Sequence, residues 1–194
     1  MSEKTIYMTK EKCIWCVGDS LYEAYHDEEW GTPVYDDATL FEFLILETFQ
    51  AGLSWITVLR KRENFRKALD NFNYKTIAKY QQDKVDSLLQ DAGIIRNKLK
   101  VNATITNAQA YMQIQKEFGS FSAYVWGFVD GKPLVNHIKN HNEVPANTAL
   151  SDTLSKDLKK RGFKFVGTTV VYAFMQATGM VNDHVVGCFK YEQG

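Results

Sequence analysis

Apolar residues recur at helical spacing over nearly the whole of this 194-residue chain, and no segment shows the alternation typical of a strand. Helices are expected over 37–52, 53–72, 74–93 (two short ones), 94–119, 120–133 (a short one and a turn), 150–163 and 166–179. There are three prolines and no low-complexity stretch that would mark a linker. The pattern predicts an all-α fold in one domain, 1–194, in which 1–12 form a flexible extension.

Residues 165–182 carry no charge and are almost long enough to cross a membrane. They contain three threonines, two glycines and a glutamine, and Lys164 and Asp183 close the segment abruptly. A buried core helix is therefore the better interpretation. The N-terminus has no apolar signal region, and three cysteines cannot all pair within one chain, so we expect a cytoplasmic protein with reduced thiols.

The chain has 23 basic and 23 acidic residues, so contact with a nucleic acid would need a local basic face. The segment 156–168 offers one, because a glycine turn there leads into a helix whose N-terminal N–H groups could hold a phosphate. Its basic residues and turn are Lys156, Lys159, Lys160, Arg161, Gly162, Lys164, Gly167 and Thr168. Basic clusters at 60–67 and 96–100 strengthen this interpretation. The alternative is an ordinary helical hairpin with a solvated charged face.

Metal-ligating side chains stand near both ends of the chain. They are Cys13, Cys16 and His26 at the start, and His184 and Cys188 at the end. Two cysteines and two histidines would make a closed tetrahedral zinc site that ties the two ends together. Three cysteines with one histidine, or core thiols without a metal, are the alternatives. His137 and His141 lie in a polar, Asn-rich loop and are expected to be solvated.

Glu47 lies among Phe43, Leu44, Leu46 and Phe49, where few charges belong. A carboxylate in an apolar aromatic setting costs free energy unless it is paired, which makes Glu47 a functional candidate. Aromatic residues make up 13% of the chain, as a protein that stacks flat rings would need. The alternative places Glu47 at the solvent edge of its helix.

Long motifs of the chain closely resemble the bacterial Tag family of DNA-3-methyladenine glycosylases. They are CIW, LYEAYHDEEWGTPVYDD, QAGLSWITVLRKRENFRKAL, LLQDAGIIRNKLK, SKDLKKRGFKFVGTTVVYAFMQA and GMVNDHVVGC. The resemblance implies a helix-hairpin-helix glycosylase fold, with the hairpin at about 150–179, and one structural Zn²⁺ per chain. The implied ligands are Cys13, His26, His184 and Cys188, with Cys16 a spare thiol.

The resemblance also implies a substrate pocket and two DNA contacts. Its pocket residues fall on Tyr22, Tyr25, Glu47 and Trp55, with Glu47 the catalytic candidate. A loop that probes the DNA stack falls on Gln50, Ala51, Gly52 and Leu53, and a phosphate anchor on Lys160, Arg161, Gly162, Lys164, Gly167 and Thr168.

The expected activity is hydrolysis of the N-glycosidic bond of 3-methyladenine in double-stranded DNA, without lyase activity, by a monomer that needs no membrane. Three other functions are kept open. One is a DNA-binding module stapled by zinc and without enzymatic activity, and another is a glycosylase for a different lesion, such as 7-methylguanine or a deaminated base. A zinc hydrolase or deaminase is the third, and it would need an open metal position.

Overall fold

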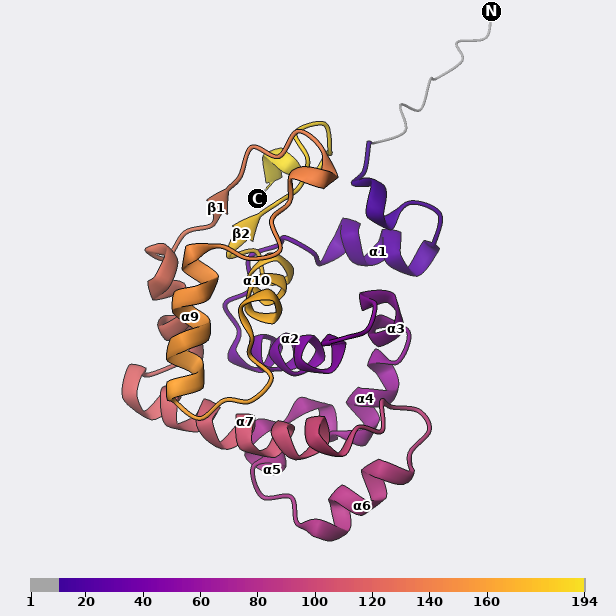
Figure 1. Cartoon of the computed structure of the whole chain (residues 1–194), viewed down its shortest axis with the longest axis vertical. Helices are drawn as coiled ribbons and strands as arrows, with labels where there is room; N and C mark the ends of the chain where they lie inside the picture. The colour runs from indigo at the N-terminus through magenta and orange to yellow at the C-terminus, as the bar shows by residue number, and fades with distance from the viewer. Residues whose placement is uncertain (1–10, 194) are drawn as a thin grey trace, which may run out of the picture.

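A computed structural model of the chain describes residues 11–193 and shows a mostly helical protein (Figure 1). Its α-helices are α1 (Ser20–Glu28), α2 (Asp37–Gln50), α3 (Trp55–Leu59), α4 (Arg62–Ala68), α5 (Tyr74–Ile77), α6 (Gln82–Gln90), α7 (Lys98–Phe118), α8 (Phe121–Trp126), α9 (Ala149–Lys160) and α10 (Thr168–Ala177). Five 3-10 turns join them, η1 (Ile14–Cys16), η2 (Asp70–Phe72), η3 (Gly127–Val129), η4 (His141–Glu143) and η5 (Tyr191–Gln193). The predicted helical architecture is confirmed.

Two short strands were not predicted. They are β1 (Leu134–Val135) and β2 (Val181–Asn182), which pair in parallel. Each is two residues long, too short to produce an alternating pattern in the sequence. Their pairing joins the loop after α8 to the segment that leaves α10.

Helix α2 lies at the centre of the molecule, between α10 and α7, and it also packs against α3 and α8 (Figure 1). Nearly every residue from Leu40 to Phe49 is buried, as expected for a helix that is apolar all round. The helix begins at Asp37, because the side chain of Asp36 accepts from the backbone N–H of Thr39 and caps the helix. Asp37 instead accepts from the backbone N–H groups of Phe121 and Ser122, at the start of α8.

Two expected helices have different bounds. The segment 53–72 contains α3, α4 and η2, and η2 places Asn71 in a left-handed conformation (φ 54°) that no α-helix continues through. The segment 94–119 becomes helical only at Lys98, because Asn97 accepts from the N–H groups of Leu99 and Lys100 and so caps α7.

Helices α9 and α10 pack against each other and are joined by the turn 161–167. Thr148 and Ser151 cap α9 with reciprocal hydrogen bonds, and α10 is largely buried. The prediction of a core helix within 165–182 is thus confirmed, over the shorter range of α10. In the part of the chain that is described, no helix has both the length and the hydropathy that crossing a membrane requires.

The two ends of the described chain lie side by side (Figure 1). The backbone N–H of Phe189 donates to the carbonyl of Glu11 over 3.0 Å. Lys12, within the extension predicted for 1–12, forms ion pairs with Glu23 and Asp27, and residues 1–10 lie outside the described residues. This arrangement brings the candidate metal ligands of the N-terminal and C-terminal segments together.

Candidate functional site

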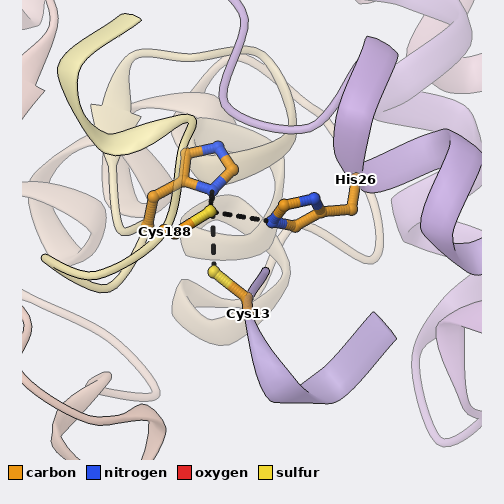
Figure 2. A group of neighbouring side chains, drawn as sticks. Cys13, His26 and Cys188 are labelled. Carbon is orange, nitrogen blue, oxygen red and sulfur yellow. Dashed lines mark hydrogen bonds between the residues drawn. The ribbon is translucent and has the colours of Figure 1, made fainter. Parts of the chain in front are cut away.

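Four side chains from the two ends of the chain converge on one buried point. The ligand atoms of Cys13, His26, His184 and Cys188 all lie within 4.8 Å of one another. The Cys188 sulfur is 3.4 Å from His26 Nε2 and 3.6 Å from His184 Nδ1. Figure 2 shows Cys13 entering from the N-terminal segment, His26 from α1 and Cys188 from the C-terminal segment. Two sulfurs and two imidazole nitrogens at this spacing could hold a metal ion.

The ring nitrogens that face away from the cluster are also held. His26 Nδ1 lies 2.9 Å from the Asp27 carboxylate, and His184 Nε2 lies 3.1 Å from the carbonyl oxygen of Trp30. Metal-bound histidines typically donate their second N–H to such oxygen atoms, which fixes the tautomer. Gly31 is required here, because a Cβ atom at this position would lie 2.7 Å from His184 Nε2. The residues present therefore fit a tetrahedral metal such as Zn²⁺.

The structure decides between the two cysteine combinations left open by the sequence. Cys16 lies outside the cluster, and its thiol donates to the Cys13 carbonyl over 3.1 Å. His184 and Cys188 do not lie on a helix, since residues 183–190 form none. A turn closed by the hydrogen bond from Cys188 N to Val185 O brings the two side chains together.

Beside the metal cluster lies a cavity of about 300 Å³. Its lining residues are Trp15, Tyr22, Tyr25, Trp30, Glu47, Gln50, Trp55, His141, Val144, Ala173 and Gln176. All four residues expected in the pocket are among them. The rings of Tyr25 and Trp55 lie 5.3 Å apart between centroids, and those of Trp15 and Tyr22 lie 4.8 Å apart. Flat aromatic walls with few polar groups suit a planar ligand.

Glu47 is 3% exposed and belongs to the pocket, so the interpretation that it lies at the solvent edge is wrong. Its Oε2 atom and the Nε1 atom of Trp55 are buried without a hydrogen-bond partner among the described residues. Burial alone raises the pKa of the Glu47 carboxyl to about 8. An unpaired acceptor and an unpaired donor in one apolar cavity are costly, and a polar, planar ligand would satisfy both.

Two tryptophans connect the metal cluster to the pocket. The ring of Trp30 packs edge-on against His184 at 4.6 Å, and Trp15 packs against His26 at 5.4 Å. Both tryptophans line the cavity, and their rings lie 5.1 Å apart. The residues that could hold a metal therefore also position one wall of the pocket.

The loop after α2 forms the rim of the pocket. Gln50 lines the cavity, whereas Leu53 is 43% exposed and points an apolar side chain into solvent. The N–H of Leu53 donates to the Gln50 carbonyl over 2.6 Å, and Gly52 adopts φ 81°, which favours glycine. We call residues 50–53 the rim loop.

The α9–α10 turn carries exposed cations. Within residues 11–193, Lys160 and Lys164 are exposed and form no ion pair. Arg161 differs, because it is bound to Asp157 and Glu117, each at 2.6 Å. Gly167 precedes α10 without a capping side chain, and the Thr168 hydroxyl pairs with that of Ser151.

The expectation that the basic cluster at 60–67 faces phosphate needs correction for two of its arginines, Arg62 and Arg66. Arg62 is buried and binds Glu29 and Glu42, each at 2.6 Å, and Arg66 also binds Glu42. Arg60 pairs with Asp19 at 2.5 Å. Arg62 and Arg66 therefore connect α4 to α2 and to the end of α1, and their charge is used inside the protein, whereas the Arg60 side chain is 62% exposed.

His141 is exposed, as expected, but it also lines the pocket, which its spacing did not predict. Five further lining residues were not predicted from the sequence: Trp15, Trp30, Val144, Ala173 and Gln176. The loop 132–148 reaches the pocket through tertiary packing, and the spacing of residues in the sequence does not predict such a contact. His137 contacts the hydroxyl of Tyr191 and lies outside the cavity. Trp15 and Trp30 stood next to expected metal and pocket residues, and that proximity was the available signal.

A helical fold that encloses an aromatic pocket with an unpaired carboxylate is suited to binding a planar, polar ring. The chain belongs to the methyladenine glycosylase family, whose profile matches residues 15–191. It is 54% identical over 181 residues to DNA-3-methyladenine glycosylase 1 of Escherichia coli strain K12, covering 93% of this chain and 97% of that protein.

Two further relatives agree. Identity to DNA-3-methyladenine glycosylase of Haemophilus influenzae is 48%, over 91% of this chain and 96% of that one. A structure on the recognition of 3-methyladenine by 3-methyladenine DNA glycosylase I of Staphylococcus aureus superposes with a TM-score of 0.90. It is 35% identical and covers 93% of this chain and 96% of that one.

Proposed function

We propose that this protein is a DNA repair glycosylase that hydrolyses the N-glycosidic bond of 3-methyladenine in alkylated double-stranded DNA, leaving an abasic site. The observation that carries the proposal is the Glu47 carboxyl, buried without a partner in an aromatic pocket. The relatives support the choice of base, since two are named for 3-methyladenine and one was studied for its recognition.

The chemistry of the damaged base explains why the pocket needs few catalytic groups. Methylation at N3 gives the adenine in DNA a positive charge, so the base is already a good leaving group. When its bond to the sugar breaks, the electron pair moves to the base and neutralises it. Water then captures the sugar cation and loses a proton. The enzyme has to extrude the base from the stack and hold it correctly.

Tyr22, Tyr25 and Trp55 form the slot that receives the extruded base, with Trp15 and Trp30 completing its walls. A cationic ring against an aromatic face contributes about 0.5–2 kcal/mol, depending on desolvation. Glu47 accepts hydrogen bonds from the adenine edge. The positive base also favours the ionised carboxylate, so a cationic purine is preferred to a neutral one.

Two segments contact the DNA. At the rim loop, Gln50 and Leu53 enter the stack at the position of the extruded base, where the exposed leucine replaces lost stacking. The α9–α10 pair is a helix-hairpin-helix element. Lys160 and Lys164, together with the free backbone N–H groups after Gly167, bind phosphate oxygens there.

Zn²⁺ bound by Cys13, His26, His184 and Cys188 is structural, because four protein ligands leave no open position for water or substrate. This closed set disfavours a zinc hydrolase or deaminase. The described residues that line the pocket include no lysine, which supports a monofunctional enzyme without a Schiff base.

The test is to incubate the protein with methylated duplex DNA and to separate the released bases by chromatography. Release of 3-methyladenine, with strands that stay intact until alkali cleaves the abasic sites, is the expected result. Release of another base alone would reassign the substrate. DNA binding without release of any base would leave the non-enzymatic DNA-binding module as the function.

A further inference from the structure

A buried lysine is hydrogen-bonded to the backbone of the rim loop and of the residue before it. Lys100, in the first turn of α7, is 5% exposed, and its Nζ atom donates to the carbonyl oxygens of Phe49 at 2.9 Å and Ala51 at 2.6 Å. These two carbonyls lie at the end of α2 and in the rim loop itself. The last carbonyls of a helix have no partner within it and carry partial negative charge, so they suit an ammonium group.

No carboxylate among the described residues pairs with Lys100 to explain its burial. Among the ion pairs of residues 11–193 it forms none, and burial lowers the pKa of its ammonium group. A buried ammonium must be hydrogen-bonded to be tolerated, and here the backbone of the 49–51 segment provides the acceptors. The lysine and the loop therefore fix each other.

The same helix holds the α9–α10 turn by a second buried polar side chain. Asn107 is fully buried, and its Nδ2 donates to the Lys164 carbonyl at 3.1 Å while its Oδ1 accepts from the Lys164 N–H at 2.7 Å. Both backbone groups of one turn residue are thus bound by one amide. Phe165, next in the chain, has φ 56°, a conformation that needs external support in a bulky residue.

Lys100 and Asn107 stand seven residues apart, which is about two helical turns and places them on the same face of α7. Figure 1 shows α7 running beneath α2 and reaching the α9–α10 turn. One rigid helix therefore links the rim loop to the turn that carries Lys164.

We propose that α7 sets the distance between the two DNA-contacting segments, with Lys100 and Asn107 as positioning residues. The inference rests on the proposed function, since it takes the rim loop and the hairpin to grip the same duplex. Phosphates along DNA lie at fixed intervals, so the loop reaches the damaged base only if the hairpin anchor is at the right separation. Misplacement by about 1 Å can cost about a hundredfold in rate.

The test compares Lys100→Met with Lys98→Met, a matched change at an exposed lysine in the same helical turn. Hydrogen–deuterium exchange of residues 49–54 should rise in Lys100→Met and stay unchanged in Lys98→Met. Single-turnover excision from methylated duplex should fall at least tenfold, while free 3-methyladenine binds within twofold of wild type. Lys100→Arg, which keeps a cationic donor, should recover part of the excision rate.

Unchanged exchange in a folded Lys100→Met protein, or equal losses of excision and free-base binding, would overturn the proposal. Should that variant not fold, Asn107→Asp provides the same test, because it loses the donor to the Lys164 carbonyl. Exchange should then rise over 162–167. The exchange measurement needs no activity, so it separates failure of this inference from failure of the proposed function.

Discussion

The indole ring of Trp30 packs edge-on against the imidazole of His184, with ring centroids 4.6 Å apart, and the Trp30 carbonyl lies 3.1 Å from His184 Nε2. Trp30 lines the pocket, and His184 belongs to the four-residue metal cluster. His184, one of the four candidate metal ligands, therefore packs directly against one wall of the pocket.

Loss of bound zinc should make both the four-residue cluster and the adjoining pocket wall less ordered. We expect one zinc per chain in the purified protein, and Cys188→Ser should lose it and lower the melting temperature by roughly 10 °C or more, since structural zinc contributes directly to folding free energy. Elemental analysis and thermal melting measure the two effects. Cys16→Ser is the matched control, because Cys16 lies outside the cluster and should keep its zinc.

The buried carboxyl of Glu47 should make stability depend on pH. Its pKa is about 8 in the folded protein and about 4.5 in an unfolded chain, so between these values only the folded state keeps the proton. The free energy of unfolding should fall as pH rises from about 5 to about 8, by up to about 5 kcal/mol, and level off above that.

The Glu47→Gln variant lacks this titration and should gain stability relative to wild type over the same range. Urea unfolding at pH 5.5 and pH 8.5 measures the difference for both proteins. Parallel pH dependence in wild type and variant would mean that water reaches the carboxyl and holds it ionised.

The cations of the α9–α10 turn should separate into two kinds. Lys160→Ala with Lys164→Ala should weaken binding to all duplex sequences alike and reduce the slope of log K against log salt by about 1 for each lost phosphate contact. Arg161→Ala should leave that slope unchanged and lower the melting temperature, because Arg161 is bound to Asp157 and Glu117. A reduced slope in the Arg161 variant would place that residue on the DNA.

Leu53, in the rim loop, should contribute to extrusion of the base and contribute little to the stability of the fold. Leu53→Ala should slow excision from duplex about tenfold or more without lowering the melting temperature, because Leu53 is 43% exposed. Leu134→Ala is the matched control, since Leu134 is 44% exposed and lies in β1, outside the pocket lining and the rim loop. Equal excision by the two variants would exclude Leu53 as the residue that replaces the base.

The sequence predicted the helices well where the apolar pattern was long and continuous. The central helix α2 and the core helix α10 are of this kind, and both are largely buried as expected. The bounds of helices were predicted less well where a capping side chain or a tertiary contact determines where the helix begins or ends. The Asn97 side chain caps α7, so the helix begins later than the apolar pattern predicts. In the segment 53–72, the left-handed Asn71 interrupts the helix although the helical spacing of apolar residues continues.

For the site, chemistry-bearing residues were easier to identify than their surroundings. Cysteines and histidines near both ends of the chain indicated five candidate ligands, and the family resemblance reduced them to four. Glu47 stood out because a carboxylate among apolar neighbours is costly unless it is paired. The basic residues at 60–67 misled, because a charge run looks the same whether it faces phosphate or the carboxylate of Glu42. His141 reaches the pocket by the path of a long loop, which local spacing does not reveal.

The role of Glu47 in excision is tested most directly by single-turnover release of 3-methyladenine from alkylated duplex by wild type and Glu47→Gln, with duplex affinity measured in parallel. We expect the variant to bind duplex within about threefold of wild type and to release the base at least a hundredfold more slowly, a loss of about 2.7 kcal/mol of transition-state stabilisation. Equal excision by both proteins, or a loss of excision fully matched by a loss of duplex affinity, would contradict the role assigned to Glu47.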